Sequence, residues 1–184
     1  MTTKIVTPMA LLLTLAACGG PSVSLTNATP DEVAKAAAAN GLKPTMRAGM
    51  WETTVEITEY DIAGMPAEMK AQALAKAKED GKKRPSKYCL SEEEAKKPGG
   101  MFTGAEESTC TYSKFEMNGG KIDMVMVCPG PGGQNMTMSV NGTFNGDTAT
   151  AVTSIKSTGQ FGMSMKANTT SKRTGDCPAA PAKK

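Results

Sequence analysis

Apolar and polar residues alternate through much of the second half of the chain. Between residues 134 and 144, apolar side chains occupy one set of alternate positions: Met136, Met138, Val140 and Phe144. A period of two is typical of a β-strand that buries one face. The stretch 49–60 has the same period and places on one face Trp51, Thr53, Val55 and Ile57. Shorter runs predict strands over 86–90, 110–117 and 121–128, with two more between residue 145 and Arg173.

A glycine turn joins the strands 110–117 and 121–128. Asn118-Gly119-Gly120 predicts a three-residue hairpin loop with glycine in its last, left-handed position. That register places Cys110 directly opposite Cys128. Opposed residues of antiparallel strands lie within disulfide reach.

Two further turns extend the pattern into a hairpin meander. Asn145-Gly146 is the strongest short hairpin signal, and it predicts two opposed pairs: Ala151 with Val140, and Ile155 with Met136. Ser157-Thr158-Gly159 predicts a three-residue turn with three opposed pairs: Ile155 with Phe161, Thr153 with Met163, and Ala151 with Met165. Both registers keep the apolar residues on one face of the sheet.

Three segments carry helix signals. Thr29 is a predicted N-cap, followed by proline and two acids, for a short helix over 30–39. Residues 66–80 are almost all strong helix formers with a thin apolar stripe, which predicts a surface-packed helix that ends at Gly81. Ser91 and Glu94 match a capping box and predict one or two helical turns up to Lys97.

These elements predict one α+β domain over residues 45–178. We expect a mainly antiparallel twisted sheet of six to seven strands, arranged as a hairpin meander, with one packed helix and a short N-terminal helix. Trp51, the only tryptophan, is expected to anchor the core, and a binding-site wall is the alternative. The Pro/Ala-rich residues 179–184 are expected to be a disordered tail.

The first 17 residues have the layout of a secretory signal peptide, with an early cation and an apolar run too short to span a bilayer. Leu15-Ala16-Ala17-Cys18 is similar to the bacterial lipobox. The similarity implies that Cys18 is lipidated, with palmitate among its acyl groups, and that it becomes the first residue of the mature chain. We expect residues 18–44 to form a lipidated tether and the short helix. The anchored domain would face the periplasm, and Gly19 favours the outer membrane over the inner one.

Four cysteines remain after Cys18, and an even number in an exported chain indicates disulfides with three possible connectivities. The hairpin register favours Cys110 with Cys128, which leaves Cys89 with Cys177. By loop entropy, each bridge is expected to stabilise the fold by ~3–4.5 kcal/mol.

The composition argues against most catalytic sites. The chain has no histidine, which excludes Ser-His-Asp and Cys-His nucleophile arrangements and His-ligated zinc. It has no Cys-x-x-Cys motif, which argues against a thioredoxin-like redox site. A formal net charge of +3 with scattered lysines gives no footprint for nucleic acid. We therefore expect no catalytic residues, no cofactor and no nucleic-acid partner.

Methionine is abundant, with 14 residues against an aromatic content of 4%. Three Met-x-Met pairs fall on three predicted strands: Met124 and Met126, Met136 and Met138, Met163 and Met165. Residues i and i+2 of a strand share a face, and thioethers are suitable ligands for Cu(I). Core packing is the favoured interpretation, since methionine fills the core of an aromatic-poor sheet and no histidine is available to complete a copper site.

Short motifs occur along the chain in a distinctive order. They are Arg47-Ala48-Gly49-Met50-Trp51-Glu52, Tyr88-Cys89-Leu90-Ser91, two cysteines around a Gly-Gly turn, and Arg173-Thr174-Gly175-Asp176-Cys177. In these motifs the chain resembles the bacterial family called domain of unknown function 3617, whose members are usually exported or lipidated. The resemblance spans roughly residues 45 to 178, and it implies a fold and a location. It implies no catalytic or binding residue.

Two functions remain open. One is a non-enzymatic envelope lipoprotein that binds an envelope protein or an apolar ligand on its methionine-rich sheet. The other is a soft-metal binder that uses the six paired methionines. Exposure distinguishes them, because a closed core would leave a scaffold role, an open methionine face would favour ligand or partner binding, and converging sulfur atoms would favour metal.

Overall fold

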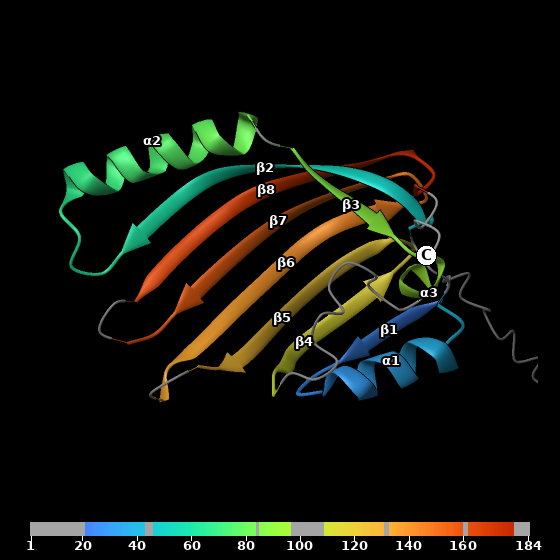
Figure 1. The fold of residues 1–184 in the computed structure, drawn as a ribbon. Coiled ribbons are helices and arrows are strands. Elements are labelled where there is room, and N and C mark those ends of the chain that lie inside the picture. Colours follow the sequence, from blue (N-terminus) through green and yellow to red (C-terminus); the bar gives the residue numbers. More distant parts are fainter. Residues whose placement is uncertain are drawn as a thin grey trace, which may run out of the picture.

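The computed structural model describes residues 21–42, 46–83, 85–96, 109–130, 133–159 and 162–178. Within these ranges the chain forms one eight-stranded antiparallel sheet with the strand order β1-β4-β5-β6-β7-β8-β2-β3 (Figure 1). The strands are β1 (Ser22–Leu25), β2 (Gly49–Ile62), β3 (Ser86–Leu90), β4 (Thr111–Asn118), β5 (Lys121–Pro129), β6 (Asn135–Asn145), β7 (Thr148–Ser157) and β8 (Met163–Gly175). The helices are α1 (Pro30–Ala39), α2 (Ala67–Lys83) and α3 (Glu92–Ala95).

The prediction of a mainly antiparallel sheet with few helices is confirmed, but the sheet has more strands than predicted. The additional strand is β1, which lies within the residues expected to form a tether. It pairs with the end of β4, where Val23 lies opposite Met117, and Val23 is only 5% exposed. A four-residue strand is too short to show a period in the sequence, and its pairing with β4 supplies the stability that it lacks alone.

The β4–β5 hairpin corrects the predicted loop. The loop has two residues, Gly119 and Gly120, both with positive φ, so Asn118 pairs with Lys121. Glycine is favoured at both positions of such a turn because it adopts positive φ without steric cost. A register shift near Ser113 then moves the pairing by one residue. The shorter loop and this register shift change the pairing by one residue in opposite directions, so the strands return to the predicted register before the cysteines.

The next two hairpins keep the predicted face but not the predicted pairs. The Asn145 side chain accepts hydrogen bonds from the N–H groups of Asp147 and Thr148, so the β6–β7 turn lies one residue later than predicted. The β7–β8 connection is also longer than predicted, and the expected partner Phe161 lies outside the described residues. The observed opposed pairs are Val140 with Thr153, Met138 with Ile155, Ile155 with Met165, Thr153 with Ala167, and Ala151 with Thr169. Shifts by an even number of residues leave each side chain on its original face.

The helix starts were predicted better than the helix ends. Thr29 is the N-cap of α1 and Ser91 forms a complete capping box, both as predicted. Thr29 also completes a capping box with Glu32, which was not predicted. However, α2 continues through Gly81 to Lys83, so Gly81 does not end the helix. A Cβ on Gly81 would lie 2.4 Å from the Val55 carbonyl oxygen. The glycine therefore allows α2 to approach the backbone of β2, along which it lies beyond the end of β3 (Figure 1).

The core lies on one face of the sheet. Trp51 and Leu90 are fully buried, and Met124 and Val140 are 1% exposed. The indole N–H of Trp51 donates to the Arg47 carbonyl oxygen at 3.0 Å, which satisfies its one polar group. Trp51 is thus a core residue, as expected.

Candidate functional site

Apolar side chains form a row on one face of the sheet across five adjacent strands. Directly opposed residues follow one another along β5, β6, β7, β8 and β2: Met126, Met138, Ile155, Met165 and Tyr60. Because strand pairs interact through opposed side chains, the register makes this row one continuous surface. The predicted methionine pairs on β5, β6 and β8 all contribute to it.

The part of this face formed by β1, β4 and β5 is covered, and we call it the closed half. Here Met117, Ile122 and Met124 are at most 2% exposed. Val33 of α1 and Ala95 of α3 belong to the same buried cluster. Two of the six paired methionines, Met124 and Met126, are therefore core residues.

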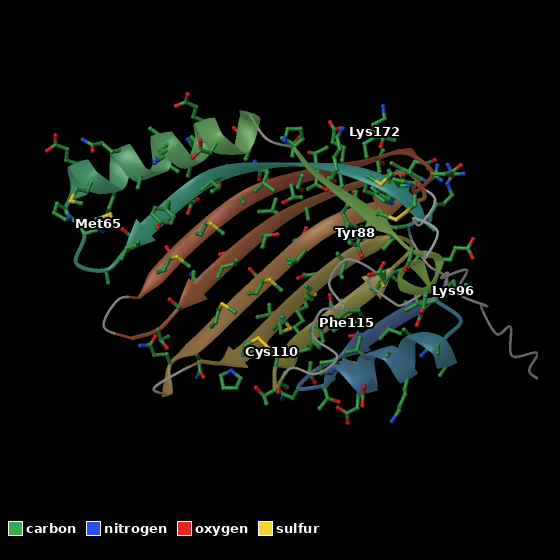
Figure 2. All side chains as sticks on the ribbon, viewed as in Figure 1. Met65, Tyr88, Lys96, Cys110, Phe115 and Lys172 are labelled. Atoms are coloured by element: carbon green, nitrogen blue, oxygen red, sulfur yellow. A yellow bond between two sulfur atoms is a disulfide. The ribbon has the colours of Figure 1, made fainter. Side chains whose placement is uncertain are left out.

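On β6, β7 and β8 the same face is buried toward the Trp51 end, where Val140 and Ala149 are at most 4% exposed. Toward the opposite end it remains partly accessible, and we call this accessible part of β6, β7 and β8 the open half. Met136 is 42% exposed. Met138, Ile155, Met163 and Met165 are each half-buried. Figure 2 shows sulfur atoms along the central strands of the sheet. Four of the six paired methionines therefore line an apolar surface that solvent can reach.

The register spreads the methionines instead of gathering them around one point. Met126 lies directly opposite Met138, but Ile155 separates Met138 from Met165. Strands two apart are ~10 Å apart at the backbone. Among the described residues, no group of three or more His, Cys, Asp or Glu side chains could hold a metal ion. A copper ion could use neighbouring thioethers of the open half only by reorienting flexible side chains.

Both predicted cysteine pairs are at bonding distance. The S–S distance is 2.02 Å for Cys110 and Cys128, and 1.93 Å for Cys89 and Cys177. The first pair fastens the start of β4 to the end of β5, and the second joins β3 to the segment that follows β8. The predicted lipidation residue, Cys18, lies outside the described residues. Among the described helices, none is long and apolar enough to cross a membrane.

The three sequence motifs that are distant in the chain meet at one end of the sheet. Trp51 lies opposite Tyr88 on one side and Arg173 on the other. The Arg173 guanidinium donates from Nε to the Ala48 carbonyl oxygen at 2.7 Å. A Cβ on Gly49 would lie 2.3 Å from the Gly175 carbonyl oxygen. These contacts give the motifs a structural role in joining β3, β2 and β8.

Sequence reasoning missed the ion pairs at this end. Arg47 donates from Nε to the Asp147 carboxylate at 2.9 Å, and Asp147 lies in the β6–β7 turn. The hydrogen bond and the charge of Asp147 raise the pKa of Arg47 above its ordinary value. Arg173 forms a second ion pair, with Asp176. Arg47 and Asp147 are 100 positions apart, so their pairing leaves no local pattern in the sequence.

The ionisation of the Tyr88 side chain is strongly perturbed. Burial of the phenol, followed by a hydrogen bond to Glu94 and the charge of that carboxylate, raises the pKa of Tyr88 to about 12. The phenol therefore stays protonated across the physiological range. Tyr88 lies opposite Trp51 in the β2–β3 pairing and is 39% exposed, and its phenol carries no charge at neutral pH.

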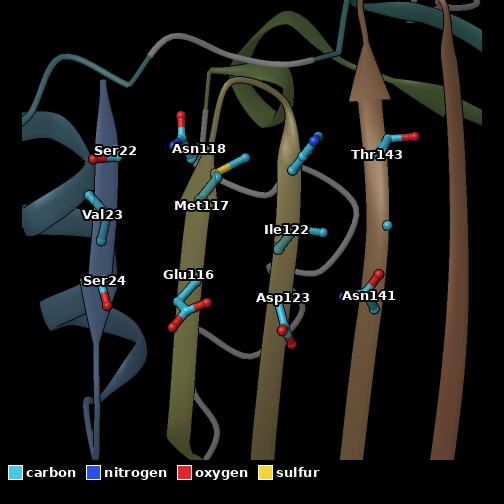
Figure 3. A pocket seen from close by; sticks show the side chains of 12 residues that line it. Ser22, Val23, Ser24, Glu116, Met117, Asn118, Ile122, Asp123, Asn141 and Thr143 are labelled. Atoms are coloured by element: carbon cyan, nitrogen blue, oxygen red, sulfur yellow. The ribbon is translucent and has the colours of Figure 1, made fainter. Parts of the chain in front are cut away.

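A polar groove of about 650 Å³ lies over β1, β4, β5 and β6 at the same end of the sheet (Figure 3). Its lining includes hydroxyl, amide and carboxylate side chains: Ser22, Ser24, Glu116, Asn118, Asp123 and Asn141. Lys114 pairs with Asp123 at 2.8 Å and with Glu116 at 3.2 Å, and both hydrogen bonds raise the pKa of Lys114. Both acids thus share one cation from the same sheet, and the group of three keeps a formal charge of −1.

Comparison with known proteins gives one match. A family model described as Protein of unknown function (DUF3617) matches residues 46–177. The match starts just before Arg47 and ends at Cys177, so it includes both disulfides and every strand except β1. No curated protein and no solved structure matches the chain.

Proposed function

This chain belongs to the DUF3617 family, and we propose that it is a non-enzymatic lipoprotein of the bacterial envelope that binds an apolar ligand on its open half. Cys18 would carry the lipid and place the domain on the periplasmic side, on the outer membrane by the identity of Gly19. The observation that carries the binding function is the accessible methionine surface on β6, β7 and β8.

The chemistry of the open half supports an apolar ligand. Methionine has a flexible, polarizable side chain that adapts to varied apolar shapes. Met136 at 42% exposure and its half-buried neighbours would gain free energy by being covered. The chain has no histidine and offers no nucleophile arrangement, which supports binding without catalysis. An apolar surface of an envelope protein could cover the open half in the same way as an apolar ligand.

The direct test uses the mature domain with Cys18→Ala, which removes the anchor. Binding of a fluorescent fatty acid is compared with that of the double variant Met136→Thr and Met165→Thr. We expect the double variant to bind about tenfold or more weakly, because apolar area in the contact is lost. Val152→Thr is the matched control, since Val152 is 41% exposed on the opposite face. Equal binding by all three proteins would exclude the open half as the ligand site.

A second candidate function, Cu(I) binding, rests on the partly accessible Met-x-Met pairs of β6 and β8. Replacement of Met136, Met138, Met163 and Met165 by leucine separates the two functions. Leucine keeps the surface apolar but removes the soft sulfur ligands. Retained fatty-acid binding with unchanged Cu(I) titration would remove the metal hypothesis, and loss of Cu(I) binding alone would establish it.

A further inference from the structure

The first strand begins very close to the predicted lipid anchor. Ser22 starts β1 and is the fourth residue after Cys18. A fully extended chain spans at most 3.3–3.6 Å per residue, so Ser22 can lie no more than ~14 Å from the lipidated cysteine. An anchored domain would therefore have almost no free tether.

The β4–β5 turn lies beside this attachment point. Ser22 is opposite Asn118, and Asn118 is opposite Lys121 across the two-residue turn. Adjacent strands are ~4.8 Å apart, which places the Lys121 backbone ~10 Å from Ser22. Figure 3 shows Ser22 and Asn118 side by side at this end of the groove. Lys121 is exposed, whereas the nearby acids Glu116 and Asp123 are both paired with Lys114.

The open half lies farther along the strands. Met126, which opposes Met138, is five residues beyond Lys121 on β5. At ~3.4 Å per residue, the row of apolar residues is ~17 Å from the turn, and Met136 lies farther still.

We propose that the Asn118–Lys121 turn rests against the phospholipid headgroups, so that the domain stands end-on on its membrane. Lys121 supplies a cation for the anionic lipid phosphates. In this orientation the open half points away from the bilayer and receives its ligand from the periplasmic side. The inference rests on the lipidation of Cys18 that belongs to the proposed function.

The experiment compares lysine labelling in the purified, lipidated full chain with that in the Cys18→Ala protein. The lipidated chain is reconstituted into vesicles of phosphatidylethanolamine and phosphatidylglycerol. A bulky, membrane-impermeant amine reagent is applied, and labelling rates are read by peptide mass spectrometry. We expect Lys121 in the reconstituted protein to react about threefold or more slowly, because the headgroup layer excludes the reagent. Lys156, near the opposite end of β7, is exposed and should react equally in both proteins.

A spacer variant separates orientation from simple attachment. A Gly/Ser segment inserted between Gly20 and Pro21 leaves β1 intact and lengthens the tether. It should restore the rate at Lys121 while the protein stays in the vesicles. Equal rates at Lys121 with and without the anchor, or protection that persists with the spacer, would overturn the proposal. The intact mass of the purified chain shows whether Cys18 carries lipid, and a chain without lipid would also overturn the proposed orientation. Fatty-acid binding by the Cys18→Ala domain does not depend on any of these outcomes, so it tests the proposed function separately.

Discussion

The closed and open halves use the same residue type on one face of one sheet with opposite results. Met124 on β5 is 1% exposed. Met136 on the neighbouring strand β6, opposite Cys128, is 42% exposed. Met124 belongs to the buried cluster to which α1 and α3 contribute Val33 and Ala95, whereas Met136 does not. Methionine content therefore does not indicate a binding surface until the cover of each residue is known.

The largest expected effect is the unequal cost of truncating the two methionines. Met124→Ala leaves a cavity in the packed core and should lower the free energy of unfolding by about 2–5 kcal/mol. Met136→Ala should change it by about 0.5 kcal/mol or less, because the side chain is largely solvated. Urea denaturation with the disulfides intact measures both. Similar losses for the two variants would contradict the division of the face into halves.

The Cys110–Cys128 disulfide tests whether the halves are independent. Cys128 ends the buried series on β5 and lies opposite Met136. Replacing both cysteines by serine should reduce the free energy of unfolding by about 3 kcal/mol, because an 18-residue loop in the unfolded chain is released. Fatty-acid binding at the open half should persist at temperatures where the variant stays folded. Loss of binding by a folded variant would show that the open half depends on this bridge.

High pH should weaken the fold near Trp51 while leaving the open half unchanged. Since the pKa of Tyr88 is raised from 10.0 to about 12, its stabilising contribution is complete below pH 10 and is lost as the pH rises through about 12. Tyrosinate absorbance should show a component that ionises near this value, and Tyr88→Phe should abolish it. Tyr112→Phe is the matched comparison, because burial also raises the pKa of Tyr112. A spectrum of Tyr88→Phe that matches the parent would contradict the assignment.

The smallest effect is expected on the polar face. Val152→Thr should change the free energy of unfolding by no more than about 0.5 kcal/mol, because the side chain is already 41% exposed among polar neighbours. Thermal unfolding measures this change. A large decrease in the free energy of unfolding would show that Val152 is covered in solution. Exposure would then not distinguish the open half from the opposite face of the sheet.

Much of the fold follows from the alternating pattern. The period of two predicted the strands, and the cysteine pairs followed from one hairpin register. The pairs predicted for the β6–β7 and β7–β8 hairpins were wrong, and so was the loop length of the β4–β5 hairpin. Hydrogen bonds by Asn145 and the left-handed glycines at 119 and 120 select turns that sequence spacing does not resolve. In the β6–β7 and β7–β8 hairpins the observed pairings differ from the predicted ones by an even number of residues, so each side chain keeps its predicted face and the apolar row is still formed.

The candidate site was less predictable than the fold. The sequence grouped six methionines as one set, but Met124 and Met126 belong to the buried cluster, which includes residues from distant parts of the chain. The strand β1 was also missed, since the four residues Ser22–Leu25 gain their order from β4, which lies about 90 residues later in the chain. Contacts at such separation leave no local periodicity.

The pairing of β2 with β8 sets an order of assembly. β2 is the longest strand, yet its main partner, β8, is nearly the last segment to be made. Strands β4 to β8 can form successive hairpins as they emerge, because each pairs with its immediate neighbour. One edge of β2, the strand that contains Trp51, therefore stays unpaired until the chain has been synthesised as far as residue 175. A chain truncated before β8 would therefore expose this strand to proteolysis or to other chains, and a protective chaperone would have its greatest effect before β8 is made.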